Sequence, residues 1–271
     1  MTASAAHPTA SPRAEFPTLG LLPRADTQAG DFVRKHPTYD GRGTVVAILD
    51  TGIDPGAKGL QVTSDGKRKV LDYVDCTGSG DVALSSPLKC SEDADLELKG
   101  PSGRLLKLNA AWCNPSGEWR VGAKRLYDIA PPQVKTSVQA ERKERFVAHA
   151  QALADSVSAR LAAAKQKLKA EDEARLELDA QAGVLASLNE AYADQGPYLD
   201  CVVFHDGRQW RAAIDTSETG DLSEAPALGA YKLSGDVGQL CKRKLLYYTL
   251  NFYDDARTLS IVTSAGSHST H

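Results

Sequence analysis

The chain has 271 residues and a formal net charge of −3, because 32 Lys and Arg stand against 35 Asp and Glu. Hydrophobic residues make up 42% and charged residues 25%, proportions typical of folded proteins, so disorder throughout the chain is excluded. The balanced charge argues against a dedicated binder of nucleic acid or anionic membrane, since such proteins carry a basic face. No apolar run approaches the roughly 20 residues that span a bilayer. We therefore expect no nucleic-acid partner and no membrane partner.

The first folded elements are predicted after a short disordered start. Residues 1–15 are mainly Ala, Pro and small polar residues, which cannot bury a core. Residues 16–75 are expected to begin the folded core. Within them, residues 44–49 read Thr-Val-Val-Ala-Ile-Leu, a continuous run typical of a strand buried on both faces of a parallel sheet. The run ends at Asp50, and turn-forming residues follow it.

Residues 76–245 form the middle of the chain, and their composition changes within it. Up to about residue 130, short strand-like stretches alternate with Gly, Pro and Asp. Between residues 136 and 193, Ala, Glu, Lys, Gln and Leu dominate, no Pro occurs, and the one glycine is Gly183. Apolar residues there recur every three or four positions, as on one face of a helix. We predict two helices, separated near Gly183, that pack as a hairpin on the body.

Strands are predicted again after residue 196. They are expected at residues 200–205, 209–214, 245–253 and 258–263. Asp206-Gly207, between the first two, is a dipeptide typical of a tight hairpin turn. Residues 246–271 are then expected to return to the core that begins at residue 16.

Two residues are candidates for catalysis, Asp50 and His268. Asp50 closes a predicted buried strand, and His268 follows the last predicted strand after a short run of small residues. Open α/β sheets place reactive groups at the carboxyl ends of their strands. An Asp followed along the chain by a His is also the order of the subtilisin triad, in which Ser comes last. In that chemistry His268 is the general base and acid, and Asp50 orients and stabilises its imidazole.

The sequence around Asp50 resembles a known family. Residues 46–57, Val-Ala-Ile-Leu-Asp-Thr-Gly-Ile-Asp-Pro-Gly-Ala, resemble the catalytic-Asp segment of the subtilisin-like serine peptidases. The closing Asp-Pro-Gly-Ala is similar to that of the tripeptidyl-peptidase II family. Further segments are similar to the same family in the same order: residues 20–23, 39–43, 77–82, 114–117, 205–207, 210–212, 220–222 and 259–264. The resemblance covers the chain from about residue 15 to its end.

The resemblance implies an α/β fold. The chain would be the N-terminal part of a subtilisin-like fold, a mostly parallel sheet with flanking helices, ending in the His motif. A long insert of strands and helices would separate the Asp and His motifs, because Asp50 and His268 lie far apart in this sequence while simple subtilisins keep the two motifs close. Residues 76–245 would be that insert.

The same resemblance implies an activity. The complete enzyme would be a cytoplasmic serine exopeptidase that releases tripeptides from the free N-termini of oligopeptides, and it would form a homo-oligomer. No cofactor and no metal are expected. The nucleophilic Ser lies beyond residue 271 in that family, so the chain alone is expected to be inactive. Ser269 stands where the family has Gly beside the catalytic His; a positive φ there would cost roughly 1 kcal/mol.

Other interpretations stay open. Without the nucleophile, the chain would be an inactive truncated form or an interaction fragment. Asp50-Thr51-Gly52 is also the signature of aspartic peptidases, which need a second Asp-Thr/Ser-Gly or a homodimer; the sequence has no second copy. His268 and His271 are spaced like two metal ligands but lack a third partner. The five cysteines show wide spacings and no C-x-x-C pair, so neither a disulfide framework nor a zinc site is expected.

Overall fold

A computed structural model of the chain describes residues 26–50, 52–90, 96–167, 169, 172–241 and 246–263. The internal contacts divide the chain into two units, one up to Leu49 and one from Asp50 onward. The described part of the first unit contains helix α1 (Ala29–Lys35). All the strands and the four remaining helices described belong to the second unit.

The strand predicted at residues 44–49 is wrong for this structure. These residues run without regular structure, and the side chains of Val45, Val46, Ile48 and Leu49 are 76–92% exposed. A strand with apolar side chains on both faces is stable only where neighbouring strands pair with its backbone and other layers cover both faces. Within the described part of the first unit no strand lies beside this run, so its composition alone does not make it a strand.

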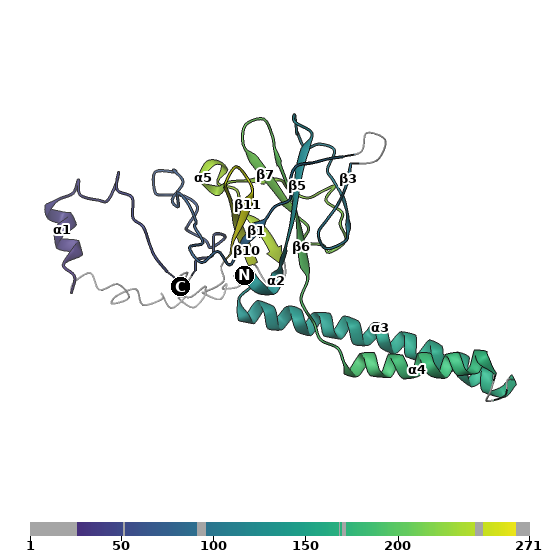
Figure 1. The fold of residues 1–271 in the computed structure, drawn as a ribbon. Helices are drawn as coiled ribbons and strands as arrows, with labels where there is room; N and C mark the ends of the chain where they lie inside the picture. The colour runs from purple at the N-terminus through teal and green to yellow at the C-terminus, as the bar shows by residue number, and fades with distance from the viewer. Residues whose placement is uncertain are drawn as a thin grey trace, which may run out of the picture. The chain divides into compact units, whose positions relative to one another are not determined.

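The second unit is built on antiparallel sheets and a helical hairpin (Figure 1). The first sheet has the strand order β1 (Asp81–Ala83), β11 (Thr258–Thr263), β10 (Leu246–Tyr253) and β9 (Gly238–Cys241). The second sheet has the order β2 (Leu88–Lys89), β5 (Glu118–Arg125), β6 (Tyr198–His205), β7 (Trp210–Ile214) and β8 (Leu228–Gly229). A separate two-stranded ladder joins β3 (Glu97–Lys99) and β4 (Leu105–Lys107).

The predicted hairpin at Asp206-Gly207 is confirmed, as are the strands predicted at residues 245–253 and 258–263. β6 pairs with β7 across the turn at Asp206-Gly207, and β10 pairs with β11. The mostly parallel sheet that the family resemblance implies is not among the described residues, where every ladder between strands is antiparallel. Short turns join β3 to β4, β6 to β7 and β10 to β11 directly. Strands joined by a short turn pair antiparallel, because parallel strands need a long crossover connection.

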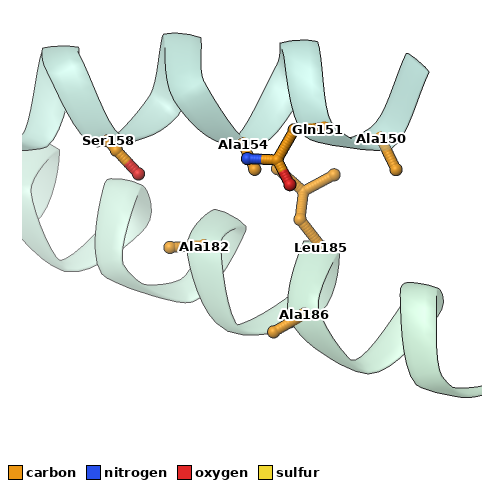
Figure 2. A pocket seen from close by; sticks show the side chains of 7 residues that line it. All are labelled: Ala150, Gln151, Ala154, Ser158, Ala182, Leu185 and Ala186. Atoms are coloured by element: carbon orange, nitrogen blue, oxygen red, sulfur yellow. The ribbon is translucent and has the colours of Figure 1, made fainter. Parts of the chain in front are cut away.

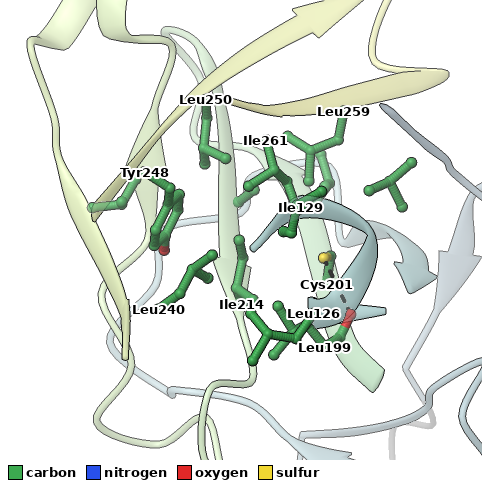
Figure 3. Packing of buried hydrophobic residues seen from close by; sticks show 14 of the residues in the cluster. Leu126, Ile129, Leu199, Cys201, Ile214, Leu240, Tyr248, Leu250, Leu259 and Ile261 are labelled. Atoms are coloured by element: carbon green, nitrogen blue, oxygen red, sulfur yellow. Dashed lines mark hydrogen bonds between the residues drawn. The ribbon is translucent and has the colours of Figure 1, made fainter. Parts of the chain in front are cut away.

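The main core is a cluster of apolar side chains shared by both sheets and by helix α2 (Leu126–Ile129) (Figure 3). Leu250, Leu259 and Ile261 come from the first sheet, and Leu199, Cys201 and Ile214 from the second. β6 is buried on its other face too, because Val202 and Phe204 point into a second cluster with Trp119 and Leu222. Successive side chains of a strand alternate between faces, so a strand covered on both sides requires this continuous apolar run.

The predicted helical hairpin is confirmed, with a different break. Its predicted packing on the body is not: among the described residues, the main core takes up only Val134 and Val138, near the start of the first helix. Helix α3 (Pro132–Lys167) and helix α4 (Glu173–Glu190) pack against each other. The first helix ends at Lys167 and the second begins at Glu173, so Gly183 is inside α4, where a glycine costs about 1 kcal/mol. Asp172 ends the connection, and its carboxylate accepts a hydrogen bond from the backbone N–H of Lys169 at 2.6 Å. The last helix is the short α5 (Tyr231–Ser234).

Candidate functional site

Asp50 lies at the end of the irregular run 44–50 and is exposed. The turn after it is formed as the sequence predicts, since the Asp54 carboxylate accepts a hydrogen bond from the backbone N–H of Gly56 at 2.9 Å. Gly56 packs on the ring of Tyr247 in β10, so closely that a Cβ would lie 2.4 Å from that ring. The turn that follows Asp50 is therefore fixed to the first sheet.

His268, the other predicted catalytic residue, lies outside the described residues, as do Ser269, His271 and Thr51. The distance between Asp50 and the imidazole is therefore not part of the described geometry, and the pairing stays a prediction. The strand that leads toward His268 is anchored near its end, because the Thr263 hydroxyl donates a 2.6 Å hydrogen bond to the carbonyl of Ile129.

The described residues offer little other chemistry. No group of three or more His, Cys, Asp or Glu among them could hold a metal ion. A cavity of about 220 Å³ lies between α3 and α4 (Figure 2). Its lining is mostly alanine, with Gln151 and Ser158 as the polar side chains. Since general acid–base or nucleophilic catalysis needs titratable groups in reach of a substrate, this cavity is a gap in helix packing. No helix in the described part of the chain has the length and apolarity to cross a bilayer.

One fully buried carboxylate ties a turn to β6. Asp200 is 0% exposed and accepts hydrogen bonds from the backbone N–H of Ser102 at 3.1 Å, from the Ser102 hydroxyl, and from the Arg104 guanidinium at 3.0 Å. A buried charge is tolerated only when it is paired and hydrogen-bonded in this way. The cluster is therefore a structural clamp on the turn that joins β3 and β4.

A second carboxylate organises the loop before β1. Asp75 accepts hydrogen bonds at one oxygen from the backbone N–H of Thr77 (2.8 Å) and its hydroxyl (2.6 Å), and at the other from the Ser79 hydroxyl (3.1 Å) and the N–H of Gly80 (2.9 Å). Partial burial acts to raise the pKa of Asp75, but the hydrogen bonds from these donors outweigh it, so the pKa is lowered. The Gly80 carbonyl then accepts the N–H of Ile261 in β11 at 2.9 Å.

The loop after β7 has the same arrangement. Asp215 accepts the N–H (3.0 Å) and hydroxyl (2.7 Å) of Ser217 at one oxygen and the N–H of Gly220 (2.9 Å) at the other. The Gly220 carbonyl accepts the N–H of Lys107 in β4 at 2.8 Å. Residues 75–82 and 215–222 share the pattern Asp-x-Ser/Thr-x-Ser/Thr-Gly-Asp followed by Val or Leu. Sequence reasoning missed this repeat, although the pattern is visible once Ser and Thr are treated as equivalent.

The turn between β6 and β7 gives a prediction for acid stability. Burial acts to raise the pKa of Asp206. Hydrogen bonds from the Arg211 guanidinium and from the backbone amides of Gln209 and Arg208 outweigh it and lower this pKa to about 2. Because this pKa is lower in the folded state than the value of roughly 4 in the unfolded state, the ionised carboxylate stabilises the fold at pH values above about 4. That stabilisation is lost as the pH falls toward 2. In urea unfolding, Asp206→Asn is expected to lower the midpoint at pH 6 and to lower it less at pH 2.5. An equal difference at both pH values would contradict this.

Comparisons with known proteins bear on the whole chain. No family model matches it. Tripeptidyl-peptidase 2 of Arabidopsis thaliana is 38% identical over 262 residues, which are 93% of this chain and 19% of that protein. The Caenorhabditis elegans protein of the same name is 36% identical over 258 residues, 93% of this chain and 18% of that protein. The chain is a homologue of one segment of tripeptidyl-peptidase 2. It spans about a fifth of the length of these relatives.

The fold of that segment is shared as well. A crystal structure of tripeptidyl peptidase 2 (TPP II) matches 88% of this chain and 18% of its own chain with a TM-score of 0.62 and 22% sequence identity. The mixed arrangement of sheets and helices is thus common to this chain and to part of tripeptidyl-peptidase 2. The family resemblance read from the motif around Asp50 is confirmed.

Proposed function

We propose that this chain is the part of a serine exopeptidase, similar to tripeptidyl-peptidase 2, that carries two of the three catalytic residues. The observation that carries the proposal is the 38% identity to tripeptidyl-peptidase 2 of Arabidopsis thaliana over 93% of the chain. The Asp50-Thr51-Gly52 motif, which resembles the catalytic-Asp segment of subtilisin-like peptidases, supports it. The complete enzyme would release tripeptides from the free N-termini of oligopeptides. It would work in the cytoplasm as a homo-oligomer, without a cofactor.

Each catalytic residue has a defined role in this proposal. His268 takes the proton from a nucleophilic Ser, which is supplied by sequence outside these 271 residues, and later gives it to the leaving amine. Asp50 accepts a hydrogen bond from the imidazole, fixes its tautomer and stabilises the cation that forms. Without the Ser, the chain performs no acyl transfer of its own.

The subtilisin-like core is also proposed. Residues 44–49 would become a central strand of a parallel sheet when strands from elsewhere in the enzyme flank it. Four exposed aliphatic side chains next to Asp50 support this, because such a run is stable only when both faces are covered. In this division residues 1–15 are a disordered start, residues 16–75 and 246–271 contribute to the catalytic core, and residues 76–245 are the insert.

A second candidate is an interaction fragment without catalytic activity. It is favoured by one observation: among the described residues, two apolar clusters draw their buried members from residues 82–261 and do not include Asp50. A fragment of this kind would bind the complete enzyme without hydrolysing peptides, which a pull-down combined with an activity assay detects.

Inhibitors and substrate termini test the exopeptidase proposal. A longer protein that contains this chain and a nucleophilic Ser is expected to hydrolyse a tripeptidyl amide with a free N-terminus. It should be inactivated by a fluorophosphonate and be insensitive to pepstatin. N-acetylation of the substrate should slow hydrolysis by about 10- to 100-fold, because a charged hydrogen bond to the amino group is lost. Pepstatin inhibition with an acid optimum would instead support the aspartic-peptidase alternative.

A further inference from the structure

The turn after Asp50 is attached to one end of β10. Gly56 lies so close to the ring of Tyr247 that the three atoms nearest to an added Cβ would all belong to that ring, at 2.4 to 2.7 Å. The turn is also closed on itself, because the Ala57 N–H donates a 3.1 Å hydrogen bond to the Asp54 carbonyl. The ring therefore contacts a defined turn that begins a few residues after Asp50.

The side chain of Tyr247 lies on the face of β10 that is turned away from the main core. Its neighbour Tyr248 is 3% exposed and belongs to that core, and successive side chains of a strand lie on opposite faces. The register between β9 and β10 also shifts by one residue between Leu246 and Tyr247. Irregularities of this kind redirect a side chain and are common beside active sites. The first sheet thus presents this ring to the turn.

A second attachment lies on the same face of β10. The side-chain amide of Asn251 donates a 2.6 Å hydrogen bond to the Tyr73 carbonyl, and both residues are buried. Asn251 is four residues along the strand from Tyr247, and even separations place side chains on one face. The segment that follows Asp50 is therefore held at two points, Gly56 and Tyr73, which fix its position along the strand.

The same end of β10 is where the chain leaves toward His268. Thr263 ends β11, and its partner across the ladder is Tyr248, next to the ring that holds the turn. Thr263 and His268 are five positions apart, and Asp50 and Gly56 are six. At roughly 3.3–3.6 Å per residue, neither stretch spans more than about 22 Å. One corner of the sheet is therefore the starting point of both segments that carry the proposed catalytic residues.

We infer that Tyr247 is a positioning residue for Asp50: through Gly56 and the turn, its ring sets where the carboxylate lies relative to the segment that carries His268. The inference rests on the serine-peptidase function proposed above. The atoms that approach Gly56 are carbons of the ring, so the position requires an aromatic side chain and not the tyrosine hydroxyl.

Steady-state kinetics of a longer protein that contains this chain and the nucleophilic Ser test the role. Tyr247→Ala should lower kcat for a tripeptidyl amide by about 100-fold, the loss that a shift of about 1 Å in a catalytic group causes, with KM within about threefold. Tyr247→Phe keeps the ring and should keep kcat within about threefold of the unchanged enzyme. Tyr198→Ala, which removes an exposed tyrosine from β6 in the other sheet, is the matched control and should do the same.

Gly56→Ala tests the contact from its other side. The φ of Gly56 lies outside the left-handed region, so the added Cβ acts through its clash with the Tyr247 ring. We expect kcat to fall by about 100-fold here too. When Gly56→Ala is combined with Tyr247→Ala the clash is gone, so the loss should stay near 100-fold. Losses that multiply to about 10⁴-fold would show that the two residues act separately and would overturn the inference.

The Asp50→Asn variant separates positioning from a general effect on the fold. Where Asp50 no longer orients the imidazole, Tyr247→Ala should lower kcat by less than a further factor of about three. If Tyr247→Ala does not fold, Gly56→Ala in the same background decides with the ring intact. A further 100-fold loss, or an unchanged kcat in Tyr247→Ala beside a slow Asp50→Asn, would overturn the positioning role alone. Full activity of Asp50→Asn would instead refute the proposed function.

Discussion

Replacing His268 with Ala is expected to lower the turnover of a tripeptidyl amide by about 10⁶-fold in a longer protein that contains this chain and the nucleophilic Ser. The reason is that the imidazole is the base in both half-reactions, and loss of that base leaves only binding and oxyanion stabilisation. The KM should change little, because His268 does not hold the substrate in its ground state. Steady-state kinetics with a free N-terminal tripeptidyl substrate measure both constants.

Asp50→Asn should lower the turnover of the same substrate by less, about 10⁴-fold, because the imidazole is present but held in the wrong tautomer. Asp54→Asn is the matched control, since it changes the second Asp of the same motif. Its carboxylate caps the N–H of Gly56, a role that an Asn oxygen also fills, so activity should stay within about threefold. Full activity of Asp50→Asn or His268→Ala would refute the triad. An inactive Asp50→Asn beside a fully active His268→Ala would point to the aspartic-peptidase alternative.

Two apolar runs show how far the sequence predicts the fold. Residues 44–49 and residues 200–205 are both predicted as strands, and each contains a continuous apolar stretch. The second is a strand because β5 and β7 flank it and an apolar cluster covers each face. The first has no flanking strand in the described part of its unit and stays irregular. Local sequence predicts that a segment is suited to a sheet, but the neighbours decide whether it joins one.

The helical hairpin was predictable because its signal is local and repeats over many turns. Its break was not. Gly183 was predicted as the boundary, yet a helix interior tolerates one glycine, and the first helix already ends at Lys167, before α4 begins at Glu173. The site shows the same division. The motif around Asp50 is a local signal that identifies the family, whereas the hydrogen bonds that define the loops at Asp75 and Asp215 appear only in three dimensions.

The second large effect is expected when the glycine at the sixth position of each repeated loop, Gly80 or Gly220, is replaced by alanine. A Cβ on Gly80 would lie 2.1 Å from the carbonyl oxygen of Ile261, and a Cβ on Gly220 would lie 2.2 Å from that of Leu105. Neither contact is tolerable, so the loop must move away from the neighbouring strand and give up the hydrogen bond that its carbonyl accepts there. We expect Gly80→Ala to lower the free energy of unfolding by about 3 kcal/mol.

Gly220→Ala should cost more, about 4 kcal/mol, because Gly220 also has φ 82° and the new side chain adds left-handed strain to the clash. Gly103→Ala is the control that isolates the strain: its φ is 91°, and nothing lies within 4 Å of the added Cβ. Its expected cost is about 1 kcal/mol. Urea unfolding of the three variants measures the order. If Gly103→Ala lowered the free energy of unfolding as much as Gly220→Ala, backbone strain alone would explain the loss. The close approach of each loop to its neighbouring strand would then not be what holds the two loops in place.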